Sequence, residues 1–149
     1  MSIIEKSVEV GVPLRTAYNQ WTQFESFPAF MDGVEEVRQV TDTTVHWRTK
    51  IAGVAREFDA EIIDQQPDRR IAWHTTEGPD QGGVVTFEPI TEATTRVALA
   101  MAFAPEGVAE RVADATNLVE RRVQGDLERF KQYIESRGTE TGGWRGSVA

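Results

Sequence analysis

Apolar residues recur every three or four positions between Pro105 and Arg137, which places them on one face of a predicted α-helix. Pro105 suits the first turn of such a helix, and Gly138, directly after Arg137, is typical of a helix end. About thirty residues rising roughly 1.5 Å each give a rod about 45 Å long, which needs a long apolar surface to lie on. The apolar face comprises Val108, Val112, Ala115, Val119, Val123, Leu127, Phe130 and Ile134.

Upstream of this helix, apolar and polar residues alternate in short segments, the pattern of half-buried β-strands. Turn residues separate most of the segments, and between the last six lies no helix of the roughly twelve residues that a parallel crossover needs. We therefore expect an antiparallel sheet with one covered and one wetter face. The predicted strands are residues 2–10, 34–41, 44–51, 56–64, 70–75, 84–88 and 95–103.

Two short helices are predicted between the first and second strands. Residues 14–23 place Leu14, Ala17, Tyr18 and Trp21 on one helical face. In the segment that follows, Pro28 fits the first turn of a second helix, which a glycine closes at position 33. Together these helices would form an aromatic shelf, which we define as Trp21, Phe24, Phe27 and Phe30.

The element order predicts an α+β fold in which a curved seven-stranded antiparallel sheet wraps around the long C-terminal helix. One helix lying flat cannot cover so wide a sheet, but a strongly twisted sheet can curl around it. Where the curvature keeps the two apart, an apolar cavity remains. We expect a single domain over residues 1–138 and a flexible, glycine-rich tail over residues 139–149; the alternative is that Trp144 docks on a groove or a partner chain.

Length and composition narrow the possible functions. A chain of 149 residues fits one domain, and the absence of cysteine excludes disulfides and thiolate chemistry. A net charge of −8 argues against nucleic-acid binding. The sequence shows neither a signal-peptide pattern nor an apolar run of about 18 residues, so we expect no membrane span and a cytoplasmic location.

Several stretches resemble one protein family over nearly the whole chain. They are FESFPAFMDGVEEVRQ, REFDAEIIDQQPDRRIAW, GGVVTFEPI, TTRVAL and DLERFKQYIESRGTETGGWRG. These stretches are similar to the polyketide cyclase/dehydrase and coenzyme Q-binding-protein-like members of the START and birch-pollen-allergen-like (SRPBCC) superfamily. The resemblance implies the helix-grip fold. It does not choose a function, because the superfamily includes carriers, cyclases and hormone receptors.

Strand parity, with the apolar set taken as inward, predicts which side chains face the long helix. Each of them could simply fill a core, but the set together with the resemblance predicts an internal cavity. The candidate ligand-binding residues are Trp47, Thr49, Arg56, Phe58, Ala60, Ile62, Trp73, Phe87, Leu99, Met101, Val112, Val119, Val123 and Asp126.

Two charged residues in that set fall on apolar faces. Asp126 projects on the apolar stripe of the long helix, and Arg56 shares the inward parity of its strand at the strand end. A carboxylate on an apolar face must be paired or protonated. Asp126 can pair with Arg122 or Arg129 at helical spacing, or either charged residue can contact a polar group of the ligand.

The candidate acid/base groups do not form a catalytic constellation. His46 and His74 both have outward parity, and we interpret them as surface histidines. Metal-binding and phosphate-binding motifs are absent, so we expect neither a metal nor a cofactor. The remaining candidates are Tyr18 and Tyr133, with Glu57, Asp59 and Glu61 forming a solvated row on the outer face.

Three functions remain possible from the sequence. The first is binding of a hydrophobic small molecule, a lipid, quinone or polyketide-like compound, which the sparse inward polar set favours (Gln39, Thr49, Thr75 and Arg56). The second is a polyketide aromatase/cyclase or dehydratase, which needs a positioned acid/base pair. The third is a protein-interaction module that uses the aromatic shelf or Trp144, and a homodimer is possible.

Overall fold

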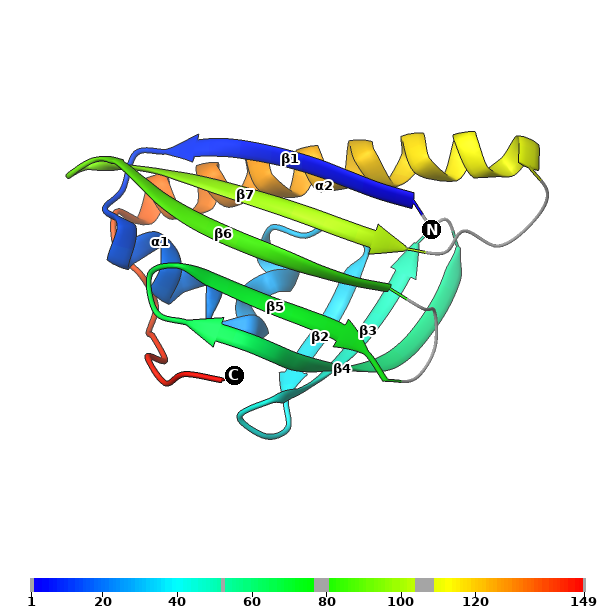
Figure 1. The fold of residues 1–149 in the computed structure, drawn as a ribbon, viewed down its shortest axis with the longest axis horizontal. Helices are drawn as coiled ribbons and strands as arrows, with labels where there is room; N and C mark the ends of the chain where they lie inside the picture. The colour runs from blue at the N-terminus through cyan, green and yellow to red at the C-terminus, as the bar shows by residue number, and fades with distance from the viewer. Residues whose placement is uncertain (1, 52, 77–80, 104–108, 149) are drawn as a thin grey trace.

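The computed structural model describes residues 2–51, 53–76, 81–103 and 109–148, with the backbone alone at 2, 51, 103 and 109–118 (Figure 1). The predicted element order is confirmed. The chain forms β1 (Ser2–Val10), α1 (Leu14–Trp21), the 3-10 helix η1 (Phe24–Ala29), β2 (Val34–Gln39), β3 (Thr44–Ile51), β4 (Val54–Gln66), β5 (Arg70–Thr75), β6 (Gln81–Thr91), β7 (Thr94–Phe103) and α2 (Ala109–Arg137).

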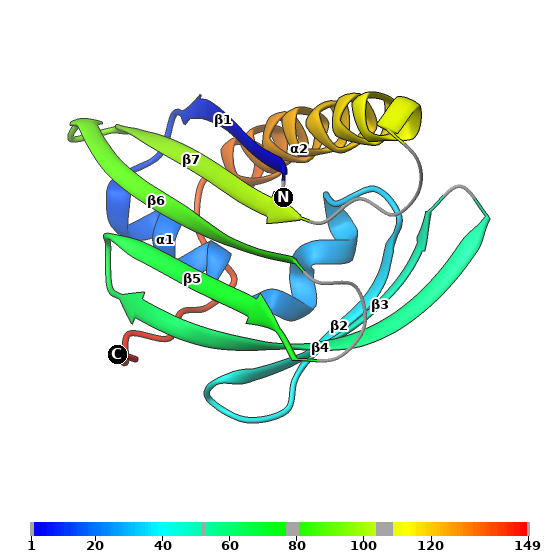
Figure 2. The same ribbon diagram turned by 45° about the vertical axis from the view of Figure 1, so that its right-hand side comes forward.

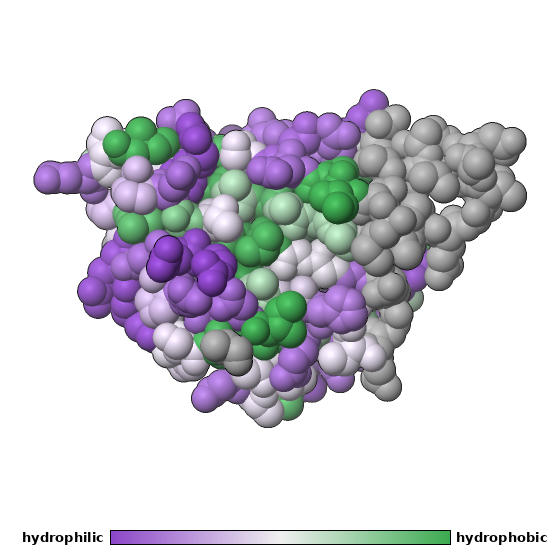
Figure 3. Space-filling model, in the orientation of Figure 1, coloured by the Kyte–Doolittle hydropathy of each residue, from purple (hydrophilic) through white to green (hydrophobic). Residues whose placement is uncertain are grey.

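The strands form one sheet in the order β1-β7-β6-β5-β4-β3-β2, and every neighbouring pair is antiparallel. The sheet curls, and Figure 2 shows α1, η1 and α2 on its concave side. This arrangement is the α+β fold that the sequence predicts. The outer face is less polar than expected, because Ala100, Val84 and Ala72 lie opposite one another across β7, β6 and β5. Figure 3 shows apolar surface over these strands.

α2 presents its apolar stripe to the interior, as predicted for the residues whose side chains are described. Val123, Leu127, Phe130 and Ile134 are all buried. The helix ends at Arg137, and Gly138 adopts a φ of 74°, the left-handed conformation that glycine adopts without strain. The predicted start of the helix, at residues 105–108, and the side chain of Val112 lie outside the described residues.

The aromatic shelf is buried in the core. Trp21 and Phe30 both contact the ring of Phe130 edge-on, with ring centroids 4.9 and 5.2 Å apart. A buried shelf offers no surface to a protein partner. This counts against the hypothesis that the protein binds a partner through the aromatic shelf. The second helix begins at Phe24, which places Pro28 inside a 3-10 helix instead of in a first helical turn.

β4 and β6 extend beyond their predicted bounds because residues at their ends pair with neighbouring strands. Gly53, at a φ of 80°, turns the chain so that Ile51 pairs directly with Val54. At the start of β6, two glycines assigned to a loop, Gly82 and Gly83, instead pair with β5. Two consecutive glycines are typical of loops, but cross-strand hydrogen bonds need no side chain.

The tail, which is predicted to be flexible, contacts the rest of the domain in the structure. Trp144 donates its backbone N–H to Thr22 Oγ1 at 3.0 Å, and Val148 forms a backbone bridge with Gln65. The glycine-rich composition of the tail gives no sign of these partners, because they lie about 80 to 120 positions away in the sequence.

Candidate ligand-binding site

The concave side of the sheet gathers most of the predicted ligand-binding residues in rows across the strands. Trp47 on β3 lies opposite Phe58 on β4, and the two rings stack with centroids 6.1 Å apart and planes 7° from parallel. A second row runs from Ile62 through Trp73 and Gly83 to Met101. The inward parity predicted for these residues is therefore confirmed, with Ala60, Phe87 and Leu99 also buried in the core.

Polar contacts fix the direction in which α2 lies along β1. Lys6 pairs with Glu120 at 2.7 Å, Lys131 Nζ donates to the carbonyl of Glu9, and Glu135 accepts the N–H of Gly11. α2 thus runs so that its N-terminal part lies beside the start of β1. Because β1 pairs with β7 in antiparallel register, the same end of the molecule holds Met101.

Burial decreases toward that end along the helix, and on the sheet it decreases at Trp73 and Met101, whereas Ile62 and Ile4 in the same row stay buried, at 3% and 6% exposed. Along α2, Leu127 and Phe130 are fully buried and Val123 is 3% exposed, whereas Val119 is only partly buried. On the sheet, Val85 is fully buried, and one row further along Trp73 and Met101 are partly exposed. We call this region, comprising Trp73, Gly83, Met101 and Val119, the open end.

Gly83 makes room for the indole of Trp73. A Cβ at position 83 would lie 2.7 Å from Cζ2 of Trp73 and 2.8 Å from the carbonyl oxygen of Ala100. The six-membered ring of the indole therefore lies over the glycine. The sequence reading missed this role of Gly83, although a glycine opposite a tryptophan on neighbouring strands is a signal for it.

The polar groups on the concave wall are few. Thr49 and Thr75 are buried, and the hydroxyl of Thr75 donates to the carbonyl of Gln81 at 3.0 Å and accepts its N–H at 3.1 Å. Arg56 lies opposite Thr49, but its side chain is exposed at the β3–β4 hairpin. A strand end gives a long cationic side chain a short path to water. Contact between Arg56 and a ligand stays a prediction.

Asp126 pairs within its own helix, as the helical spacing suggested. Its side chain is 13% exposed and forms an ion pair with Arg129. The same carboxylate accepts the N–H of Asp32 at 3.1 Å, while Arg129 Nε donates to the carbonyl of Phe30 and Arg122 to that of Asp32. Burial raises the pKa of Asp126, and these hydrogen bonds oppose that effect. The carboxylate thus secures the loop between η1 and β2.

An open hollow of about 480 Å³ lies at this loop, lined by residues 28–34 and Arg129. It is distinct from the predicted cavity between sheet and helix. That cavity would be lined from the helix side partly by residues 109–118, including Val112, whose side chains lie outside the described residues. The internal cavity therefore stays a prediction, supported by the decrease in burial toward the open end.

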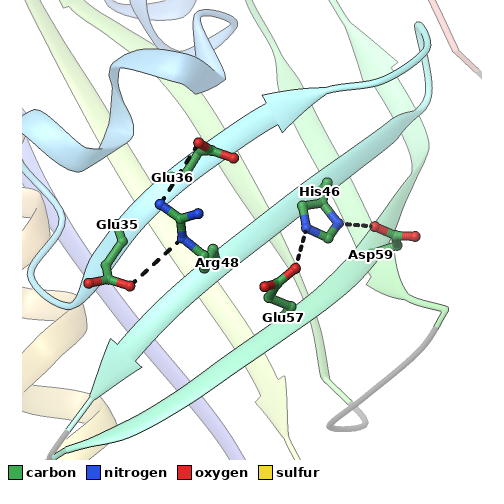
Figure 4. A network of polar contacts seen from close by, with 6 residues as sticks. All are labelled: Glu35, Glu36, His46, Arg48, Glu57 and Asp59. Atoms are coloured by element: carbon green, nitrogen blue, oxygen red, sulfur yellow. Dashed lines mark hydrogen bonds and ion pairs between the residues drawn. The ribbon is translucent and has the colours of Figure 1, made fainter.

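Both histidines lie on the outer face, as predicted. His46 contacts two carboxylates of β4, Asp59 at 2.7 Å through Nδ1 and Glu57 at 3.1 Å through Nε2 (Figure 4). The hydrogen bond with Asp59 raises the pKa of His46, because both contacts favour the charged imidazolium. The sequence reading missed these contacts, which depend on the register of β3 against β4. Because His46 lies on the outer face of the sheet, it cannot act on a molecule bound in the interior.

Tyr18 is the buried phenol of the interior. It is fully buried, contacts Phe87 edge-on at 5.3 Å, and its hydroxyl accepts a hydrogen bond from Gln65 Nε2 at 3.1 Å. Burial raises the pKa of Tyr18, so its hydroxyl stays protonated at neutral pH. Tyr133 is partly buried against the ring of Phe30. Among the described residues, no three His, Cys, Asp or Glu side chains form a group that could hold a metal ion.

A sequence model of the family described as "Polyketide cyclase / dehydrase and lipid transport" matches residues 10–132. The chain belongs to this family. An uncharacterized 17.2 kDa protein of Streptomyces lincolnensis is 58% identical over 149 residues, covering 99% of each chain. This relative carries no described activity that could be compared with the site.

Several solved structures share the fold at low sequence identity. The Zhui aromatase/cyclase from a Streptomyces species is 17% identical with a TM-score of 0.79, covering 96% of this chain and 99% of its own. A START superfamily protein of Mycobacterium smegmatis is 14% identical with a TM-score of 0.69, covering 91% and 95%. Likeness at these identities establishes the helix-grip fold alone, and the function of the site has to be argued from its residues. None of the helices in the described ranges is both long and apolar enough to cross a membrane.

Proposed function

We propose that this protein binds an apolar small molecule, a lipid, quinone or polyketide-like compound, between the concave wall of the sheet and the N-terminal half of α2. The observation that carries the proposal is the decrease in burial from Leu127 to Val119 and from Val85 to Trp73 and Met101. Apolar side chains that stay partly exposed on an inner face leave area for a ligand to cover. Each 100 Å² of apolar area removed from water contributes about 2.5 kcal/mol to the binding free energy. The freedom of motion that ligand and side chains lose on binding reduces this gain.

The shape of the wall supports a flat or chain-like ligand. The stacked rings of Trp47 and Phe58 and the indole of Trp73 lying over Gly83 offer broad apolar faces. Near the open end, the buried polar groups of the described wall include the hydroxyls of Thr49 and Thr75, and both histidines lie on the opposite face. Such a wall binds through area and shape, and it needs no catalytic group to do so.

Titration with the fluorescent fatty acid cis-parinaric acid tests the proposal. We expect a saturable fluorescence increase at one molecule per chain. The substitution Trp73→Ala removes the broadest apolar side chain of the open end and should weaken binding about tenfold or more. Ile63→Ala, on the outer face of the same sheet where the side chain is 54% exposed, is the matched control and should leave binding unchanged. Equal binding by both variants would contradict an interior site.

Aromatase/cyclase or dehydratase activity is the second candidate, favoured by the shared fold of an aromatase/cyclase and by the protonated phenol of Tyr18 in the interior. The phenol would act as a general acid only toward a carbonyl group of a ligand that extends from the open end as far as Tyr18. Incubation with a poly-β-ketone substrate separates the two functions. Turnover that is lost in Tyr18→Phe supports the enzyme, and binding at one per chain without turnover supports the carrier. The possible homodimer stays a prediction that light scattering on the purified protein can check.

A further inference from the structure

α1 carries an unusual set of buried polar side chains, and the C-terminal tail supplies their partners. Asn19 is 6% exposed, Gln20 is fully buried, and Thr22, directly after the helix, is 2% exposed. Asn19 Nδ2 donates to Glu140 at 2.9 Å. Gln20 donates to Thr141 Oγ1 at 3.1 Å and accepts the Thr141 N–H at 2.9 Å, and Thr22 Oγ1 accepts the N–H of residue 144 at 3.0 Å. Buried polar groups need such partners.

The second half of the tail crosses from α1 to the turn between β4 and β5. Arg145 donates through Nη1 to Asn19 Oδ1 at 2.7 Å and through Nη2 to Asp68 Oδ2 at 2.6 Å. Its guanidinium also lies 5.6 Å from the ring centroid of Tyr18. Val148 and Gln65 then exchange two backbone hydrogen bonds, at 2.7 and 2.9 Å, in the manner of an added strand.

The steric fit is as close as the polar fit. A Cβ at Gly142 would lie 2.8 Å from Gln23 Oε1, and one at Gly143 would lie 2.7 Å from Asn19 Cγ. The two glycines therefore let the backbone of the tail approach the surface of α1. Under the tail, Gln65 Oε1 and Asp68 Oδ1 are buried without a hydrogen-bond partner in the described structure.

We infer that the surface formed by α1, Thr22 and the β4–β5 turn is a recognition groove for an extended peptide. Its ligand is the tail segment of the same chain, residues 140–148. The groove reads a carboxylate at position 140, a hydroxyl at 141 and a guanidinium at 145 through side chains that point at each of them. Because the tail is tethered, its effective concentration at the groove is of the order of millimolar, which a free peptide must match to compete.

Hydrogen exchange on the full-length protein tests whether the tail occupies the groove. The N–H groups of Thr141, Trp144 and Val148 all donate to the groove, so we expect them to exchange slowly. Arg145→Ala should accelerate their exchange about tenfold or more and leave the amides of the central strands unchanged. Arg121→Ala, at an exposed position on α2, is the matched control and should change neither set. Unprotected tail amides in the native protein would overturn the inference.

A peptide added in trans tests whether the groove is a recognition surface in its own right. The double variant Glu140→Ala, Arg145→Ala keeps the groove and weakens the tethered tail. A labelled peptide with the sequence of residues 139–149 should bind this variant in a saturable manner, about tenfold tighter than it binds the native chain. Adding Asn19→Ala should abolish that binding, because Asn19 contacts both charged ends of the motif. Equal binding to the native chain and the double variant would overturn the inference. Neither test involves the open end, so both are independent of the proposed ligand.

Discussion

Two valines one turn apart on α2 offer a matched test of the open end. Val123 is 3% exposed in the core, whereas Val119 is partly buried beside the open end. Substitution by alanine removes the same two methyl groups at each site and changes the helix propensity equally, so the difference reports burial alone. At Val123 the lost transfer free energy is about 1.6 kcal/mol, taking about 0.8 kcal/mol for each group.

The cavity left at Val123 raises the expected loss to about 2–3 kcal/mol, which lowers Tm by about 5–10 °C for a chain of this size. At Val119 the side chain is only partly buried, so we expect a loss of about 1 kcal/mol or less. Urea unfolding of the ligand-free protein measures both values, provided that the two variants keep the same m-value. Equal losses at the two positions would refute the decrease in burial along α2, and with it the open end.

Three further predictions concern single side chains. Gly83→Ala brings a Cβ to 2.7 Å from the indole of Trp73, so we expect thermal unfolding to show a loss of about 1–3 kcal/mol. NMR titration of His46 should give a pKa above 6.5, and Asp59→Asn should lower that pKa. The charged imidazolium stabilises the folded state fully below pH 6.5, and this stabilisation is lost as pH rises through the raised pKa. Burial raises the pKa of Asp126, so the folded state binds a proton before the unfolded chain does as pH falls. The free energy of unfolding should therefore decline as pH rises from the pKa of Asp126 in the unfolded chain through its raised pKa in the folded state. Asp126→Asn should remove this pH dependence, which urea unfolding at a series of pH values measures.

Local periodicity was sufficient to predict the elements and the side that each presents to the core. The stripe from Val123 to Ile134 and the stop at Gly138 follow from helical spacing and glycine chemistry alone. The inward parity of Trp47, Phe58 and the other strand residues follows from the two-residue repeat of a β-strand. These properties depend on near neighbours in the sequence, so the sequence pattern contains them.

Contacts between distant residues could not be predicted in the same way. The pairing of His46 with Asp59 depends on the register of β3 against β4. The space that Gly83 leaves for Trp73 depends on the register of β5 against β6. The partners of Arg145 lie 77 and 126 positions away. One signal for the tail was present in the sequence, since the family resemblance extends through it to Gly146.

Native mass spectrometry of gently purified protein, followed by organic extraction, tests the central claim most directly. The account predicts one apolar small molecule per chain, or uptake of one molecule when the protein is incubated with a mixture of fatty acids and quinones. The mass of the bare chain alone, before and after that incubation, would contradict a binding site at the open end.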